Sequence, residues 1–336
     1  MMIRFLVRRL IFAVILVFFV SSLALLLVGL APGDYASDLF GGIGANPAQV
    51  AAARASEGLD RPLGEQYAAW LGRAARLDFG NSLLYRRPVI ELVRQRAVNT
   101  AILALAALLL ATGIGLPLGV FTGSARTGGA SSRFALGLVR TASILVLSVP
   151  PLLMSLLLVF LAARTGWLPV GGMTSAAAAD FGLQASGFSN WVALARDVAW
   201  HLPVPVLALA LPIAAMLERL LAQSMADTVG APFILCAAAR GVSRERLVWR
   251  HALRVALRPI LAIYGLIVGT LLSGSFMVEI VTAWPGLGRL TYDALRGRDV
   301  YLVAGCAAAG AFFLAIGSLL SDAAQAAVDP RLREAA

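Results

Sequence analysis

Long apolar runs alternate with shorter polar segments along most of this chain. A helix needs about 20 residues to cross the hydrocarbon core of a bilayer, and six runs reach that length. They cover residues 10–30, 100–123, 141–163, 202–221, 259–281 and 301–320. The pattern therefore predicts an all-α integral membrane protein with six transmembrane helices.

Prolines interrupt several of these runs. Those within the predicted helices are Pro117, Pro150, Pro151, Pro203, Pro205 and Pro212. Each proline removes a backbone hydrogen bond, which neighbouring helices or water must replace inside the membrane. We therefore expect kinked helices that are bundled around a cavity.

The polar segments between the runs suggest how the chain is organised. We expect an N-terminus with the first helix at 1–31, an external lobe between helices 1 and 2 at 32–99, a five-helix core at 100–322 with a polar loop at 222–258 between helices 4 and 5, and a tail at 323–336. Within the lobe, helical patterns at 48–54 and 65–77 flank a turn at 58–62.

Composition and charge support the membrane class and give an orientation. Apolar residues make up 60% of the 336 positions and charged residues 14%, and the formal net charge is +10. Arginines gather in the N-terminal segment, the second-to-third and fourth-to-fifth connections and the tail. The positive-inside rule therefore predicts that both termini face the cytosol. No basic groove rich in aromatic residues is evident, so we expect no nucleic-acid partner.

The most informative polar segment lies between the fourth and fifth runs. Residues Ile234 to Arg240 form a short helical pattern that ends at Gly241, which can adopt the left-handed conformation that often closes a helix. Ser243 can then cap a second helix, which gives a helix, a sharp turn and a helix. Arginines recur every fourth residue along that second helix, at Arg246, Arg250, Arg254 and Arg258. We expect the last two to anchor the helix at lipid headgroups.

This segment resembles the EAA-type loop of ATP-binding-cassette (ABC) importer permeases, which docks onto a separate ATPase subunit. The resemblance assigns ATPase coupling to Phe233, Cys236, Ala237, Ala238, Arg240, Gly241, Arg244 and Glu245. The family usually has Tyr at the place of Phe233, Thr at the place of Cys236 and Arg-Ala-Lys at the place of 238–240. A basic residue before the glycine is kept, so docking would be retained.

Further fragments extend the resemblance over nearly the whole chain. In order they are Pro32-Gly33-Asp34, Ser148-Val149-Pro150, Trp167-Leu168-Pro169-Val170-Gly171-Gly172, His201-Leu202-Pro203, Trp284-Pro285-Gly286-Leu287-Gly288-Arg289-Leu290 and Asp329-Pro330-Arg331-Leu332-Arg333. Together they are similar to the B-type subunit of dipeptide/oligopeptide (peptide/nickel) importers.

The resemblance implies a set of partners in a bacterial inner membrane. These are a second homologous permease, two ABC ATPase subunits or domains, an external substrate-binding protein and the lipid bilayer. The chain has no lysine and no Gly-x-x-x-x-Gly-Lys-Ser/Thr loop, so we expect it to be a non-catalytic subunit without a cofactor of its own, with ATP and Mg²⁺ held by the ATPases. The two cysteines, Cys236 and Cys306, predict neither a disulfide nor a metal site.

Three further assignments concern the outer side and the substrate. We expect contacts with the external partner at Arg54, Arg61, Trp284, Pro285 and Gly286, and we place Glu279 in the translocation path.

Peptides are the favoured substrate, with a nickel chelate, glutathione or a peptide-like antibiotic as alternatives. A self-contained secondary transporter or channel is an alternative from another class. It would be expected to show inverted repeats and intramembrane charges, and neither is evident. An intramembrane protease would need catalytic motifs that the sequence lacks.

Overall fold

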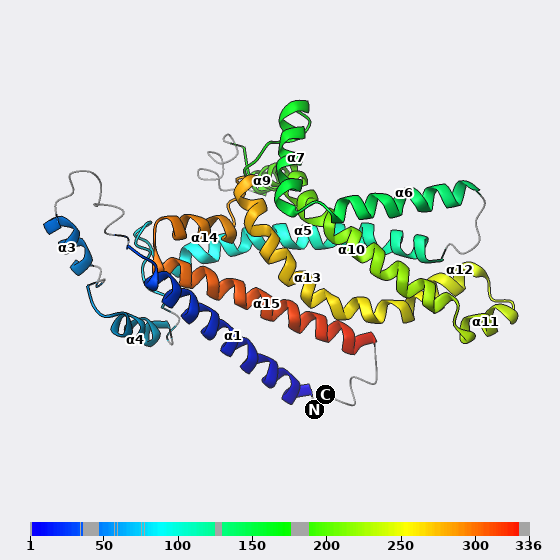
Figure 1. Cartoon of the computed structure of the whole chain (residues 1–336), viewed down its shortest axis with the longest axis horizontal. Helices are drawn as coiled ribbons and strands as arrows, with labels where there is room; N and C mark the ends of the chain where they lie inside the picture. Colours follow the sequence, from blue (N-terminus) through cyan, green and yellow to red (C-terminus); the bar gives the residue numbers. More distant parts are fainter. Residues whose placement is uncertain are drawn as a thin grey trace. The chain divides into compact units, whose positions relative to one another are not determined.

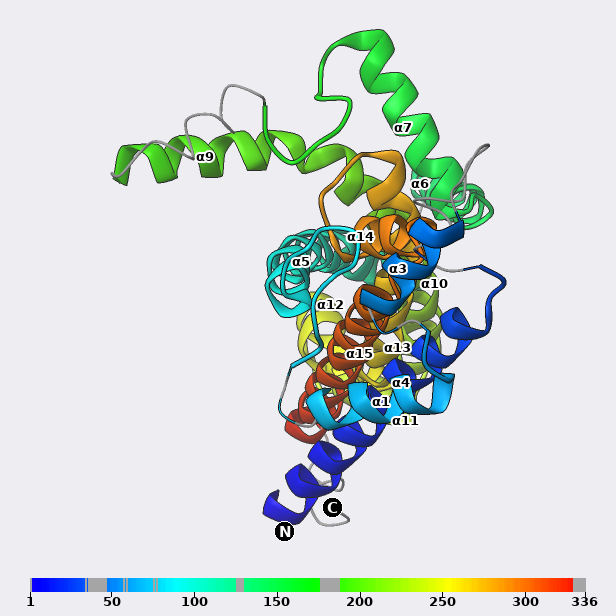
Figure 2. The same ribbon diagram turned by 90° about the vertical axis from the view of Figure 1, so that its left-hand side faces the viewer.

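A computed structural model of the chain describes residues 2–33, 35, 47–56, 58, 60–74, 76, 78–124, 130–175 and 188–328. Helices account for most of these residues, and one isolated antiparallel bridge joins Asn81 to Pro88. The helices are drawn in Figures 1 and 2, and the chain divides into two compact units. The first unit comprises Met1–Ala101 and Pro285–Ile316, and the second comprises Ile102–Trp284 and Gly317–Ala336. Two long helices, α5 (Val89–Ser124) and α15 (Val300–Val328), contribute residues to both units.

The long helices confirm an all-α membrane protein. Among the described residues, five helical segments are long and apolar enough to cross a bilayer, namely Val7–Leu30, Val89–Ser124, Pro203–Val229, Arg244–Val281 and Val300–Gln325. A sixth span results if α6 (Ala130–Leu147) and α7 (Pro151–Thr165) together form one crossing. These segments include five of the six predicted apolar runs, and α6 and α7 share the remaining one.

The run predicted at 141–163 is divided between α6 and α7, which are separate helices bent by 105° at a short break, so the bend expected at Pro150 and Pro151 is present and interrupts the helix. Pro150 has an extended backbone (φ −59°, ψ 148°), and Pro151 occupies the first turn of α7. A residue that precedes proline avoids the helical region, so two consecutive prolines favour a break here. By contrast, Pro117 and Pro212 lie inside the continuous helices α5 and α10 (Pro203–Val229).

The first unit contains α1 (Met2–Leu30), α3 (Pro47–Ser56), α4 (Leu63–Ala74) and α14 (Leu287–Arg296). The structure confirms the two helices expected at 48–54 and 65–77, with slightly different ends. Trp70 of α4 is 1% exposed, and its ring lies 6.2 Å from that of Tyr67 and 6.4 Å from that of Phe79. The apolar surface of Trp70 that is buried in this way holds α4 against the rest of the unit.

Asp299 anchors the loop that precedes α5. Its carboxylate is 0% exposed and accepts hydrogen bonds from Ser82 Oγ (2.6 Å), Leu84 N (3.1 Å) and Leu302 N (3.0 Å). The contact with Leu302 satisfies an amide in the first turn of α15, as an N-cap side chain does. One buried carboxylate therefore joins the start of α15 to the loop at 81–88.

The second unit is built around α10, which packs against α6, α7 and α13 (Leu253–Val281). Figure 1 shows α10 and α13 lying side by side in this unit. Leu217, Leu221 and Met225 of α10 are 0% exposed. The helix α9 (Phe188–His201) leads into α10 at Pro203. The centrally placed α10 thus carries much of the core of this unit.

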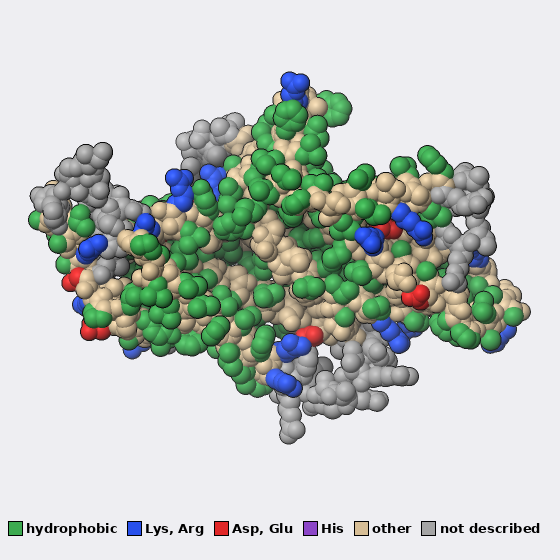
Figure 3. Space-filling view, in the orientation of Figure 1, with side chains coloured by type: hydrophobic (Ala, Val, Ile, Leu, Met, Phe, Trp, Pro, Cys, Tyr) green, Lys and Arg blue, Asp and Glu red, His purple; other side chains and the backbone are tan. Residues whose placement is uncertain are grey.

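Hydrophobic side chains are spread over much of the visible surface in Figure 3, with few charged side chains among them. On α1, Leu10 is 66% exposed and Val14 is 62% exposed, and on α6 Phe134 is 76% exposed. A water-soluble monomer rarely exposes contiguous apolar surface of this extent. These faces are suited to lipid tails or to other membrane subunits.

Candidate functional site

The loop between α10 and α13 has the conformation that its sequence predicts. The helix α11 (Pro232–Ala239) is followed by Gly241 with φ +82° and then by the short helix α12 (Arg244–Arg246). The amide of Gly241 donates to Ala238 O (3.0 Å), and that of Val242 donates to Ala237 O (3.2 Å). This pair of bonds is the Schellman motif, in which a left-handed residue closes the helix.

Gly241 is required here for its backbone conformation and not for space. A β-carbon placed at this position would meet nothing within 4 Å. A φ of +82° is nevertheless strained for any residue with a side chain. The prediction for Ser243 is only partly correct, because it occupies the N-cap of α12 but its side chain makes no capping hydrogen bond.

The α10–α13 loop presents most of the predicted coupling residues at the surface. Ile234 is 4% exposed and fixes α11 to the core, whereas Phe233 is 49% exposed. Ala237 is half-buried, and the other predicted coupling residues are exposed, namely Cys236, Ala238, Arg240, Gly241, Arg244 and Glu245. Sequence reasoning missed Leu235 and Trp249, which are 59% and 52% exposed in the same loop. Their presence as large apolar residues within a basic segment was the signal in the sequence that could have identified them.

A π-helical turn, η1 (Leu247–Ala252), connects α12 to α13. The buried positions that follow α12 are Leu247, Ala252, Ala256 and Ile260, so the first step is five residues and the next two are four. A π turn bonds each amide to the fifth residue before it, which matches the five-residue step. The four arginines at 246, 250, 254 and 258 are exposed. Anchoring at lipid headgroups by the last two stays a prediction.

Arg244 has a partner inside the chain. Its Nη2 donates to the backbone oxygen of Ser124, the last residue of α5, over 3.3 Å. Carbonyl groups at a helix C-terminus lack helical partners and carry a partial negative charge, so a guanidinium is favourable there. This contact differs from the ATPase contact that the sequence suggested for Arg244.

A second polar contact joins α5 to α10 nearby. Glu218 is 1% exposed and Thr122 is 2% exposed, and Thr122 Oγ1 donates to Glu218 Oε1 over 2.5 Å. Within the described part of the chain, Glu218 Oε2 has no hydrogen-bond partner. The sequence analysis did not predict this pair, because the register between two helices cannot be derived from one sequence.

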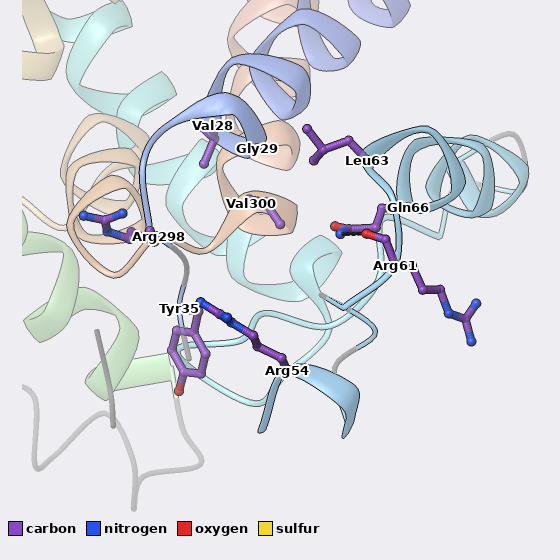
Figure 4. Close-up of a pocket in the computed structure, with 10 residues that line it drawn as sticks. Val28, Gly29, Tyr35, Arg54, Arg61, Leu63, Gln66, Arg298 and Val300 are labelled. Atoms are coloured by element: carbon purple, nitrogen blue, oxygen red, sulfur yellow. Dashed lines mark hydrogen bonds between the residues drawn. The ribbon is translucent and has the colours of Figure 1, made fainter. Parts of the chain in front are cut away.

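The residues predicted to contact an external partner differ in their exposure to solvent. Arg54 and Arg61 line a cavity of about 270 Å³ together with Tyr35, Gln66 and Arg298. Figure 4 shows the Arg54 side chain reaching towards Tyr35, whereas the guanidinium of Arg61 points away from the other lining residues. Arg61 is exposed and Arg54 is half-buried. Both side chains are thus placed at or near the surface of the first unit.

The predicted surface position of Trp284 and Gly286 is not what the structure shows. Trp284 is 0% exposed and lies in the hydrophobic core of the second unit, and Gly286 is buried at the N-cap of α14. Burying an indole removes a large apolar area from water, and this gain in free energy favours the core position of Trp284. Only Pro285 of these three residues is partly exposed, and its carbonyl accepts a hydrogen bond from Asn99 Nδ2 (2.8 Å).

Glu279 of α13 is also 0% exposed. Its assignment to the translocation path stays a prediction, and in this conformation its carboxylate is shielded by the chain itself. An ionisable group inside a membrane helix is a functional candidate by default. Glu218 of α10 is a second buried carboxyl group of this kind.

Comparison with known proteins covers nearly the entire chain. The family model described as "Binding-protein-dependent transport system inner membrane component" matches residues 115–334, and the model described as "Binding-prot-dependent transport system membrane comp, N-term" matches residues 2–104. The dipeptide transport system permease protein DppB of Escherichia coli (strain K12) is 31% identical over 345 residues, with 99% of each chain covered.

Two further relatives are named for other substrates. The oligopeptide transport system permease protein AppB of Bacillus subtilis (strain 168) is 32% identical over 277 residues, with 82% of each chain covered. The glutathione transport system permease protein GsiC of Escherichia coli O1:K1 / APEC is 30% identical over 333 residues, with 99% of each chain covered. With these matches, the several apolar helices and the loop between α10 and α13, the chain belongs to the family of multi-pass inner-membrane components of binding-protein-dependent transport systems.

Proposed function

We propose that this chain is the transmembrane subunit of an ATP-driven ABC importer for peptides. The observation that carries the proposal is the α10–α13 loop, whose glycine-closed turn presents aromatic and basic side chains at the surface. The full-length similarity to dipeptide and oligopeptide permeases supports the same function. A loop of this kind is suited to receive mechanical work from another protein.

ATP is hydrolysed by partner subunits in this proposal. The sequence has no lysine and no phosphate-binding loop, so ATP and Mg²⁺ are assigned to two ABC ATPase subunits or domains. A second homologous permease completes the translocation path. Phe233, Cys236 and Arg240 meet the ATPase, because they are exposed on α11 and beside the turn. An external substrate-binding protein delivers the peptide.

The orientation follows from the arginine distribution. With both termini in the cytosol, the α10–α13 loop faces the ATPases, and α3 and α4 face the compartment of the binding protein. Arg54 and Arg61 then supply positive charge for a transient contact with that protein.

Reconstitution tests the function and its alternatives together. The chain is co-expressed with a homologous permease, ABC ATPases and a substrate-binding protein encoded in the same genome, purified through a tag on this chain and reconstituted into proteoliposomes. Co-purification of the ATPases and ATP-dependent uptake of labelled dialanine are the expected results. If labelled glutathione or a nickel–histidine chelate is taken up and peptides are not, that compound is the substrate of the importer. Uptake by this chain alone, without ATPases, would refute an ABC importer.

A further inference from the structure

The last turn of α5 contacts both α10 and the start of α12, which follows the Gly241 turn. Thr122 contacts Glu218 on α10, the helix that leads into the loop, and Ser124 accepts a hydrogen bond from Arg244, which follows the loop's turn. The two contacts are two residues apart on α5. One end of α5 is therefore attached both before and after the segment that we assign to ATPase docking.

The packing between α5 and α10 is close over three turns. A β-carbon at Gly115 would lie 2.6 Å from Ala214 O, one at Gly119 would lie 2.9 Å from Glu218 O, and one at Gly123 would lie 2.5 Å from Ala222 O. These separations leave no room for a side chain. Glycines spaced by four residues allow membrane helices to approach at their backbones, where dispersion forces and polar contacts hold them together.

The Thr122–Glu218 contact lies within this close packing. Both side chains are almost completely buried, and the hydrogen bond between them measures 2.5 Å. A buried carboxyl group with only one paired oxygen is an expensive way to fill space, since an apolar side chain would avoid the cost of desolvation. Stability alone does not explain an acid at position 218. A role in holding two helices in a fixed register does explain it.

We propose that the α10–α13 loop moves the last turn of α5 together with α10, and that Thr122 and Glu218 are positioning residues for this movement. The inference rests on the proposed function, because it requires an ATPase that moves the loop. It identifies α5 as the helix that carries the movement away from the loop and into the membrane, in addition to α10. Arg244 assists by holding α12 at the C-terminal carbonyl of α5.

Two reporter cysteines test the proposal in the assembled complex, on a background in which Cys306 is replaced by alanine and Cys236, which we assign to the ATPase contact, by the similarly sized serine, once this background is shown to retain ATP-dependent uptake. Ala239→Cys reports on the loop, and Ser124→Cys reports on the end of α5 while keeping the backbone oxygen that Arg244 contacts. The rate of labelling by a hydrophilic maleimide is measured before and after the ATPases are trapped with ADP and vanadate. Both rates are expected to change on trapping when Thr122 and Glu218 are present.

Matched substitutions then separate positioning from simple packing. Thr122→Ser keeps the hydroxyl and should retain both changes, whereas Thr122→Val has the same shape without the hydroxyl. In Thr122→Val the change at Ser124→Cys should be lost or reduced about two- to tenfold, the usual effect of one interhelical hydrogen bond on an equilibrium, while the change at Ala239→Cys remains. Glu218→Gln keeps an oxygen that can accept from Thr122 and should resemble the parent.

The outcomes distinguish this inference from the proposed function. No change at Ala239→Cys in the parent would overturn the proposed function and the inference with it. A change at Ala239→Cys without one at Ser124→Cys in the parent would overturn the inference alone. The same would follow if Thr122→Val and Thr122→Ser behaved alike. Co-purified ATPase is quantified for each variant, so that a loss caused by failed assembly is recognised.

Discussion

Replacing Gly241 should weaken the coupling of ATP hydrolysis to transport in proportion to the backbone strain. The residue has φ +82°, and the space around its β-position is open, so the whole effect of a substitution comes from the backbone. For alanine the left-handed conformation costs about 1–2 kcal/mol, and for a β-branched residue up to about 3 kcal/mol. Since 1.4 kcal/mol is tenfold in an equilibrium, Gly241→Val should depopulate the native turn about a hundredfold.

Asparagine tolerates the left-handed region better than other residues with side chains, so Gly241→Asn should be the mildest change. We expect the order Asn, Ala, Val for increasing loss of labelled dialanine uptake and of ATP hydrolysis stimulated by the binding protein. Gly230→Ala is a matched control in the same loop, because Gly230 has φ −84°, a backbone angle that alanine adopts without strain. Assembly with the ATPases should persist in all four variants.

Two results would refute this reasoning. Uptake and stimulated hydrolysis at parental levels in Gly241→Val would remove the turn from the coupling mechanism. Equal losses in Gly241→Asn and Gly241→Val would show that the ATPase contacts this position directly and that strain is not the cause, because both side chains would then obstruct the same surface.

Three other predictions follow from the same structure. On a cysteine-free background, Ser243→Cys should react with an impermeant maleimide only from the cytosolic side and Arg296→Cys only from the outside, and the reverse pattern would invert the topology. Arg54→Glu and Arg61→Glu should each reduce binding-protein-stimulated ATP hydrolysis, most strongly at low ionic strength, without reducing co-purification of the ATPases; unchanged stimulation would remove both residues from the external contact. Asp299→Ala should leave three donors without their acceptor and lower the thermal unfolding temperature of the complex, with Asp299→Asn intermediate, whereas an unchanged unfolding temperature would show that water replaces the carboxylate.

The structure also limits which deletions are informative. Removing residues 46–72 would test whether the segment that includes α3 and α4 binds the external partner. That deletion would also remove Trp70, which is 1% exposed and holds α4 in the core of the first unit. Point substitutions at Arg54 and Arg61 keep this core and are the better experiment.

The membrane helices could be predicted from the sequence because hydropathy and length are local properties. The turn at Gly241 was predictable for the same reason, since an alanine-rich run that ends in glycine has few alternatives. The break at Pro150 and Pro151 had a visible signal, but a proline can kink, end or merely occupy a helix, as Pro212 shows.

Contacts between helices were beyond the reach of the sequence. Gly115, Gly119 and Gly123 are spaced by four residues, which indicates a close helix contact without naming the partner helix. The pairing of Thr122 with Glu218 depends on the register of α5 against α10, which only the packed structure defines. The burial of Trp284 was not predictable, because a segment between two apolar runs is expected at the surface and its packing depends on other helices.

The π turn at Leu247–Ala252 has a consequence for insertions and deletions. Such a turn holds one residue more than the α-helical turn that would span the same height. Deleting a single residue inside it would convert it to α-helix and leave Leu247 four positions before Ala252, still on the side that faces the core. The same deletion one turn later, near Val255, would rotate every preceding side chain by about 100° relative to the core. The stretch from α12 to α13 therefore has one place where its length can change by a residue without exchanging its buried and exposed sides.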